Sequence, residues 1–220
     1  MIKCPLCRYR AEFFLQDKKR AFYRCDQCGL VFANPQSHLM PAAQLQRYGR
    51  ANKASKQKQL IQFIKPLLSQ ISAQQSGSLT GLNFGRVLDK ASLNKIEHAG
   101  HRLYQYDPFV KADQQLFNQQ YDFICCYRVL EHFQQPGKEW QLLSKLLKPG
   151  GWLAISTSLM TDLNHFSKWH FKNNPTHVSF YQQQTFEYLA QHSEFTLLFA
   201  AKELVLMQKT SKSDIKRILI

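Results

Sequence analysis

Residues 121–158 constrain the fold more than any other part of this chain. They open with an apolar run at residues 122–127 (DFICCY), which is typical of a strand buried on both faces. Apolar residues then recur on one side of a predicted helix, which begins at Lys138 and ends at the Pro-Gly-Gly letters of residues 149–151. A second buried strand is predicted at residues 152–156. Because a strand, a crossover helix and a strand occur within so few residues, the strands should be parallel and the fold should be of the α/β class.

In such sheets ligands bind at the carboxyl ends of the strands, so the letters YRVLEH at residues 127–132 mark the expected place for chemistry. The letters VLEHF, followed by LLKPGGWLAIST, resemble the later motifs of class I S-adenosylmethionine-dependent methyltransferases in order, spacing and residue type. The resemblance implies a Rossmann-like, mostly parallel sheet with an antiparallel last strand, and S-adenosylmethionine as the cofactor. The alternative is an unrelated strand-helix-strand unit with a Pro-Gly-Gly turn.

Two CxxC pairs lie near the N-terminus, Cys4 with Cys7 and Cys25 with Cys28, separated by 17 residues. This spacing is close to that of a zinc ribbon, in which two turns present four thiolates tetrahedrally. Four sulfur donors predict a closed, structural zinc site, because no coordination position is left for a substrate. The metal would contribute most of the folding free energy of so small a segment. The alternative is four cysteines that bind no metal.

The chain is expected to divide into four parts. These are a zinc ribbon at residues 1–40, a helical connector and linker at 41–78, a methyltransferase-like domain at 79–209 and a basic tail at 210–220. Within the ribbon, strands are predicted at residues 11–15 and 21–24. At the far end, an antiparallel pair of strands at residues 195–201 and 203–209 should complete the large sheet.

The first strand of the large sheet is predicted at residues 79–85 (LTGLNFG). In class I methyltransferases the turn after this strand is normally rich in glycine, which lets the backbone approach the cofactor closely. Here the turn keeps Gly85 but has Arg86 and Val87 beyond it, and Asn83 stands where an acid is usual. We therefore assign Gly85 to the cofactor and expect weak binding of S-adenosylmethionine.

A second strand is predicted at residues 102–106, after a helix at 86–99, and Asp107 lies at its tip. The resemblance implies that Asp107 binds the ribose of the cofactor, because a carboxylate can accept hydrogen bonds from both ribose hydroxyls. Tyr127 and Glu131 are assigned to the cofactor on the same grounds. The alternative role for Asp107 is to form the Asp-Pro turn.

Residues 160–181 are rich in aromatic side chains and histidines, which an ordinary polar loop would not carry. They resemble the insertion that covers the substrate in small bacterial methyltransferases, which implies that Trp169 and Tyr181 contact the substrate. His132 and His177 are the candidate catalytic bases, because imidazole titrates near neutral pH. The alternative is that these rings only pack the loop onto the sheet.

Positive charge is concentrated near the N-terminus. The chain has a formal net charge of +14, and residues 1–60 contain twelve Lys or Arg but only three Asp or Glu. Such a face could attract RNA by release of counterions, or it could simply be solvated. The substrate could therefore be a small molecule or RNA. Without an apolar leader or an apolar run long enough to span a bilayer, we expect a cytoplasmic protein.

The sequence thus supports an S-adenosylmethionine-dependent methyltransferase with a zinc ribbon. One alternative is a catalytically inactive descendant that keeps the fold and binds RNA or protein. The loss of glycines from the turn after the first strand favours this alternative. Another is a zinc-ribbon ribosomal RNA methyltransferase, whose likeness to this chain is one of architecture only.

Overall fold

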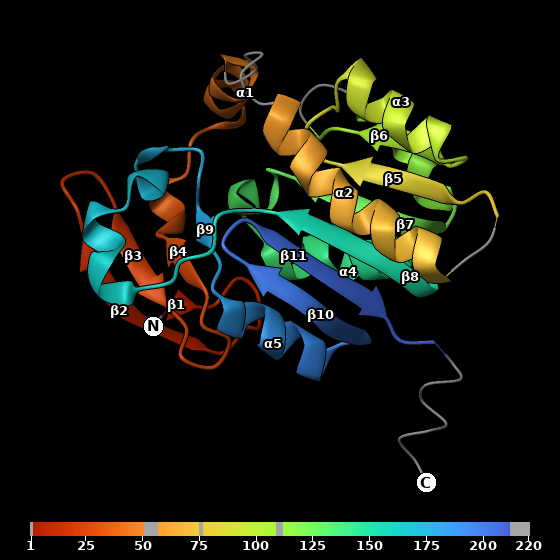
Figure 1. Ribbon diagram of the computed structural model, residues 1–220. Coiled ribbons are helices and arrows are strands. Elements are labelled where there is room, and N and C mark those ends of the chain that lie inside the picture. The colour runs from red at the N-terminus through yellow and green to blue at the C-terminus, as the bar shows by residue number, and fades with distance from the viewer. Residues whose placement is uncertain (1, 51–56, 75–76, 109–111, 212–220) are drawn as a thin grey trace, which may run out of the picture.

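The computed structural model describes residues 2–50, 57–74, 77–108 and 112–211. Within these residues the larger sheet has six strands in the order β10-β11-β8-β7-β5-β6 (Figure 1). The central strands β6, β5, β7 and β8 are parallel, whereas β11 pairs antiparallel with both β8 and β10. Their bounds are β5 (Thr80–Phe84), β6 (Arg102–Tyr106), β7 (Tyr121–Tyr127), β8 (Leu147–Ser156), β10 (Phe195–Ala201) and β11 (Leu204–Lys209). The predicted mostly parallel sheet with an antiparallel end is confirmed.

Helices cover both faces of this sheet. On one face, α2 (Gln57–Gln74) and α3 (Lys90–His98) pack against Cys125 and its neighbours. On the opposite face, α4 (Pro136–Leu146) and α5 (Gln183–His192) pack against Cys126. The adjacent cysteines of β7 therefore face different cores, as expected for alternating side chains of a strand buried on both sides. None of the helices in the described part of the chain is long and apolar enough to cross a membrane.

Two helix boundaries differ from the sequence-based expectation. Helix α3 begins at Lys90 rather than at residue 86, because the side chain of Asp89 accepts a hydrogen bond of 2.8 Å from the backbone N–H of Ser92 and caps the helix there. Helix α4 ends at Leu146, but the Pro-Gly-Gly letters belong to β8 and not to a separate turn. The pairing of β7 with β8 is irregular between Tyr121 and Phe123. Tyr121 pairs with Leu147 and Phe123 with Trp152, so residues 148–151 of β8 lie within this irregularity.

The N-terminal residues form a second, antiparallel sheet in the order β1-β2-β3-β4-β9. Four of its strands come from the ribbon, namely β1 (Ile2–Lys3), β2 (Arg10–Gln16), β3 (Ala21–Arg24) and β4 (Val31–Ala33). The fifth, β9 (Ser179–Phe180), comes from the aromatic segment at residues 160–181, which we call the insertion. Val31 pairs with Phe180, so the ribbon and the insertion share one sheet.

A third core lies between the ribbon and the insertion. Phe22 and Val31 of the ribbon are fully buried there against Phe166, Val178 and Phe180 of the insertion. The ring centroids of Phe22 and Phe166 are 5.1 Å apart in an edge-to-face arrangement, which is favourable for aromatic pairs. The aromatic richness of the insertion is thus explained in large part by its packing on the ribbon.

The ribbon also rests on the beginnings of two helices of the larger sheet. The backbone N–H of Gly137, in the first turn of α4, donates a hydrogen bond of 3.2 Å to the carbonyl of Pro5. The side-chain amide of Gln182, which caps α5, donates to the carbonyl of Gly29. The two CxxC turns are therefore each seated at a helix N-terminus.

Gly137 is required by this close approach, and we expect Gly137→Ala to destabilise the protein. A Cβ atom at residue 137 would lie 2.5 Å from the carbonyl oxygen of Leu6, which is backbone and cannot move away cheaply. Helix propensity alone would make the substitution stabilising by about 0.5 to 1 kcal/mol. We instead expect a loss of about 1 to 3 kcal/mol, measured by urea unfolding. The neighbouring exposed substitution Lys138→Ala is the control, and a Gly137→Ala protein more stable than the wild type would contradict the packing.

Candidate functional site

The four ribbon cysteines converge on one point. The Sγ atoms of Cys4 and Cys28 are 3.6 Å apart, those of Cys7 and Cys25 are 3.4 Å apart, and all four lie within 4.8 Å of one another. Four sulfurs around a tetrahedral zinc at about 2.3 Å would be about 3.8 Å from one another. The cluster therefore has the donor set and nearly the spacing of a structural zinc site.

The two CxxC turns have equivalent backbone geometry. The N–H of Arg8 donates to the carbonyl of Cys4 (3.0 Å), and the N–H of Gly29 donates in the same way to the carbonyl of Cys25 (2.8 Å). Arg8 and Gly29 both have left-handed backbone, with φ of 67° and 71°. This repeated turn directs both pairs of sulfurs toward the shared centre.

At the carboxyl edge of the larger sheet, the structure brings Gly85 and Asp107 together. The N–H of Gly85 donates a hydrogen bond of 2.8 Å to the carbonyl of Tyr106, so Asp107 follows directly beside it. Asp107 is only 2% exposed. Gly85 has a φ of 131°, and a Cβ atom there would lie 2.7 Å from Cβ of Val129. Glycine is therefore required at residue 85 by the loop after β7 as well as by the turn itself.

The residue before this turn retains an unused hydrogen-bonding atom. Asn83 is fully buried, and its Nδ2 donates to the carbonyl of Arg86 (2.8 Å). Its Oδ1 is buried without a hydrogen-bond partner among the described residues. An orphaned acceptor at the end of a central parallel strand is what a bound polar ligand would satisfy. This position fits a cofactor at the edge where the sequence predicts it.

A cluster of three side chains lies just beyond β7. The chain turns at Arg128, whose φ is 50°, and enters a short helical turn that carries Glu131 and His132. His177 of the insertion completes the cluster, and one ligand atom from each of the three residues lies within 4.8 Å of the others. All three residues are buried. The structure thus brings the two predicted catalytic histidines together.

Hydrogen bonds determine which nitrogen of each imidazole carries the proton. Nδ1 of His132 lies 3.0 Å from the carbonyl of Thr176, and Nδ1 of His177 lies 2.8 Å from the carbonyl of Phe171, so both Nδ1 atoms must donate. The amide nitrogen of Asn174 is 3.0 Å from Nε2 of His177. Its oxygen accepts from the N–H of Thr176, which fixes the amide orientation. Nε2 is therefore the proton-accepting atom of each ring.

Burial keeps both imidazoles neutral at pH 7. Desolvation lowers the pKa of His132 to about 4, and it does the same for His177, where the carboxylate of Glu131 opposes the shift. The three groups also meet the distance requirement of a metal site. A cation bound to Nε2 of His177 would, however, have to displace the amide of Asn174. A proton taken up at Nε2 of His177 would have to displace the same amide.

Glu131 connects three parts of the fold at this point. Its carboxylate accepts a hydrogen bond of 3.0 Å from the hydroxyl of Thr157, at the end of β8. Its backbone carbonyl accepts one of 2.8 Å from the N–H of Val178 in the insertion. Glu131 therefore holds the loop after β7 in place, and its assignment to the cofactor stays a prediction.

The residues assigned to the substrate lie in different surroundings. Tyr181 is 2% exposed, stacks on Phe186 and donates its hydroxyl to the carbonyl of Leu130 at 3.2 Å. Trp169 packs against Phe180 but also lines a cavity of about 350 Å³ beside Lys168. Contact of either residue with substrate stays a prediction, and Trp169 is the one that borders open space.

Tyr127, assigned to the cofactor, lines a larger cavity of about 550 Å³ at the carboxyl ends of β7 and β8. Phe63 of α2, Ser156 of β8 and Phe199 of β10 form other parts of its wall. This volume is within the range of small-molecule sites, and the position is where sheets of this class bind ligands.

Sequence reasoning missed the polar residues that orient the histidine cluster, Thr157, Asn174 and Thr176. The last two stand in the letters NNPTH before His177, where an Asn side chain that caps the backbone N–H two residues later is a recognisable turn signal. Thr157 has no such local signal, because its partner Glu131 is 26 residues away.

Comparison with known proteins places the chain in a family. A family model described as a methyltransferase domain matches residues 57–199. A ubiquinone biosynthesis O-methyltransferase from Leptothrix cholodnii is 30% identical over 92 residues, which are 41% of this chain and 39% of that protein. The protein of the same name from Vibrio cholerae is 33% identical over 92 residues, 41% of this chain and 37% of its own length. The match thus spans about two fifths of each curated relative.

A solved structure shows the same fold. It is a 1,6-didemethyltoxoflavin-N1-methyltransferase from Burkholderia thailandensis with bound 1,6-didemethyltoxoflavin and S-adenosylhomocysteine. The likeness covers 92% of this chain and 100% of that chain, with 14% identity and a TM-score of 0.51. The Rossmann-like methyltransferase fold predicted from the sequence is confirmed.

The buried histidines predict a specific pH dependence of stability. Their folded pKa of about 4 lies below the ordinary value of 6.5, so the unfolded chain binds protons that the folded chain excludes. The free energy of unfolding is therefore unaffected by these histidines above about pH 6.5, and it decreases as the pH falls toward 4. Between about pH 7.5 and 5 each histidine should lower the free energy of unfolding by about 2 kcal/mol.

Urea unfolding at these two pH values would measure this loss in the wild type, in His132→Asn and in His177→Gln. Each substitution should reduce the pH-dependent loss by about 2 kcal/mol, even if it lowers stability at both pH values. The exposed substitution His170→Gln is the control and should leave the difference between the two pH values unchanged. Equal pH dependence in all four proteins would contradict the assignment of buried neutral histidines.

Proposed function

The chain belongs to the methyltransferase-domain family, and from this premise we propose that it transfers the methyl group of S-adenosylmethionine to an acidic hydroxyl of a small molecule. The observation that carries the proposal is the pair of buried, neutral histidines, which stands at the carboxyl end of β7 inside the matched domain. This is the edge at which parallel sheets of this class bind their ligands.

Gly85 and Asp107 are the residues that would hold the cofactor. Gly85 gives the backbone a turn without a side chain, and Asp107 offers a carboxylate beside it for the ribose hydroxyls. The orphaned Oδ1 of Asn83 supplies a further acceptor. When bound, S-adenosylmethionine supplies an electrophilic methyl group on a sulfonium sulfur.

The protein's contribution to the reaction is alignment and removal of one proton. We assign proton acceptance to Nε2 of His132, because the carbonyl of Thr176 holds its Nδ1–H and fixes the ring. An imidazole with a pKa of about 4 holds a proton weakly, so it suits an acceptor hydroxyl that is itself acidic, such as a phenol or an enol. The curated relatives are named as O-methyltransferases, which also supports an oxygen nucleophile.

A small molecule is the proposed acceptor in preference to RNA. The solved structure with the same fold contains 1,6-didemethyltoxoflavin, a small molecule, beside S-adenosylhomocysteine. The cavity beside Tyr127, about 550 Å³, has a volume that suits such a molecule.

We further propose that the ribbon cysteines hold one structural zinc ion. The support is the cluster of four sulfur donors, found among the residues that the structure describes, and the repeated turn geometry that directs them to one centre. Thiolate ligation requires reduced cysteines, and on that ground the cytoplasm is the proposed location. The division into ribbon, connector, methyltransferase domain and tail at residues 1–40, 41–78, 79–209 and 210–220 is kept as a proposal, and most of the tail lies outside the described residues.

Binding of S-adenosylmethionine should depend on Asp107. Asp107→Asn keeps the shape of the side chain but removes an acceptor, and it should weaken the affinity about tenfold to a hundredfold, measured by calorimetry. Asp113→Asn, an exposed carboxylate six residues away, is the matched control and should leave the affinity unchanged. A wild-type protein that does not bind the cofactor at about 1 mM would refute the enzyme and favour a non-catalytic binding module.

The purified protein should contain one zinc per chain by elemental analysis. Cys25→Ser should lower the zinc content and the melting temperature together, because the metal stabilises the ribbon sheet. Cys125→Ala, which removes a buried thiol of β7 outside the cluster, should keep the zinc. Full zinc content in Cys25→Ser would overturn the assignment of the ligands.

A further inference from the structure

A further cavity lies outside the histidine cluster, between the ribbon and the insertion. Its volume is about 720 Å³, within the range of small-molecule sites. The polar turn between β2 and β3 forms one side, and Lys172, Asn173 and Pro175 of the insertion form another. Its charged lining residues are Asp17, Lys18, Lys19, Arg20, Arg47 and Lys172.

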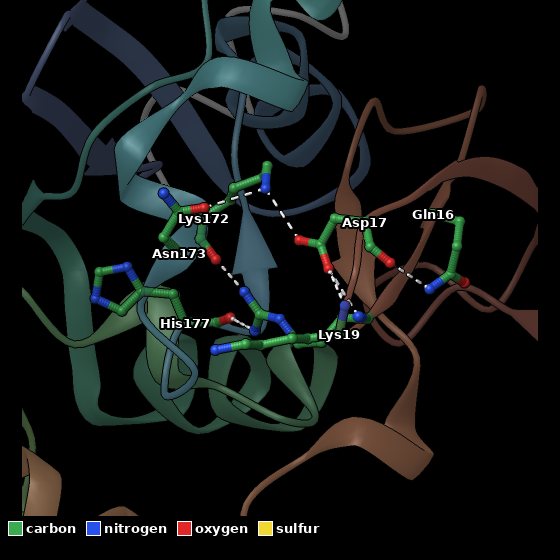
Figure 2. A network of polar contacts seen from close by, with 7 residues as sticks. Gln16, Asp17, Lys19, Lys172, Asn173 and His177 are labelled. Carbon is green, nitrogen blue, oxygen red and sulfur yellow. Dashed lines mark hydrogen bonds and ion pairs between the residues drawn. The ribbon is translucent and has the colours of Figure 1, made fainter.

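A network of polar contacts fixes the floor of this cavity (Figure 2). Arg20 donates through Nη1 to the carbonyl of His177 (2.9 Å) and through Nη2 to the carbonyl of Lys172. Nζ of Lys172 lies 3.0 Å from Oδ2 of Asp17 and 3.1 Å from Oδ1 of Asn173. Oδ1 of Asp17 accepts from the backbone N–H groups of Lys19 and Arg20, so Asp17 and its partner Lys172 are held in place before any ligand arrives.

Positive charge in the cavity exceeds what the protein neutralises. Arg20 is 7% exposed and Lys172 is 4% exposed, and desolvation lowers the pKa of Arg20. Burial of a cation is unfavourable unless an anion pairs with it. Among the described residues that line the cavity, Asp17 is the one carboxylate, against five cationic side chains. A dianionic ligand would compensate this charge far better than a single carboxylate.

We propose that this cavity binds a phosphate group, carried by the small-molecule acceptor of the methyl group. The proposal rests on the proposed function for the role of the ligand as acceptor. Lysine ammonium and arginine guanidinium groups are the usual protein partners of phosphate oxygens, and here they come from the ribbon, from α1 (Pro41–Arg50) and from the insertion.

His177 connects this phosphate site to the histidine cluster. Its backbone carbonyl accepts the hydrogen bond from Arg20, whereas its ring stands with the ring of His132, at a centroid distance of 5.0 Å. The link between the phosphate site and the histidine rings therefore runs through the backbone of His177. Binding of the phosphate in this cavity assigns the ribbon a role in substrate binding in addition to its packing role.

The direct test is calorimetric titration of the full-length protein with inorganic pyrophosphate. Lys18, Lys19 and Arg47 are exposed, so the triple substitution to alanine should fold normally. We expect the wild type to bind and the triple variant to lose at least about tenfold in affinity. A control with Lys90, Lys138 and Lys145 changed to alanine has the same loss of charge at exposed positions elsewhere and should bind as the wild type does.

Two further ligands distinguish the chemistry of the site. Succinate should bind at least about tenfold more weakly than pyrophosphate at the same ionic strength. Equal binding of both anions would overturn the assignment to phosphate. A generic double-stranded RNA that binds with steep salt dependence, loses affinity in the same triple variant and displaces pyrophosphate would make this face an RNA surface and would also overturn the proposal. Absence of pyrophosphate binding by the wild type would do so directly.

Cofactor affinity separates this proposal from the proposed function. The triple variant should bind S-adenosylmethionine as tightly as the wild type does, because none of its three positions lies at the carboxyl edge of the larger sheet. If the wild type binds pyrophosphate but not S-adenosylmethionine, the phosphate site stands and the methyl transfer fails. If it binds the cofactor but the triple variant keeps its affinity for pyrophosphate, the phosphate site fails alone.

Discussion

The convergence of the four ribbon cysteines is the constraint on which the positions of the ribbon and the insertion depend. The Sγ atoms of the two CxxC turns lie within 4.8 Å of one another, and each turn is seated on the first residues of a helix. The ribbon is thereby fixed on the larger sheet. Its last strand, β4, then pairs with β9 of the insertion, whose preceding residues carry His177. The segment that carries the four cysteines thus helps to place His177, although it belongs to a different sheet from β7.

Much of this structure could be predicted because its signals are local. The alternation from a strand pattern to a helix pattern in residues 121–158 is a matter of periodicity, and it predicted the parallel pair β7 and β8. The CxxC spacing is also a local signal, because each cysteine pair lies within one turn. It predicted the convergence of Cys4, Cys7, Cys25 and Cys28. Asp107 was predicted at the tip of the second strand, and it lies there, directly after β6 and beside the end of the parallel strand β5.

Other features could not be predicted because they depend on contacts between distant residues. The pairing of Val31 with Phe180 joins positions that share no periodicity or motif, and a two-residue strand leaves almost no pattern of its own. Arg20 and Lys172, 152 residues apart, read as solvated charges in the sequence, yet each is buried by the other's segment. The sequence therefore left open whether the basic N-terminal residues bind RNA or are only solvated, and it gave no sign of the cavity that residues 18–20 line.

The shared sheet of ribbon and insertion has a consequence for how proteins of this architecture can diversify. Neither part is a module with its own closed edge, since β4 without β9 would expose backbone groups and the apolar side chains of Phe22 and Val31. Recombination that exchanged the ribbon between two such proteins would therefore have to exchange the insertion as well. The two segments, separated by more than a hundred residues of sequence, should therefore be inherited as one unit, and a graft of the ribbon alone should yield insoluble protein.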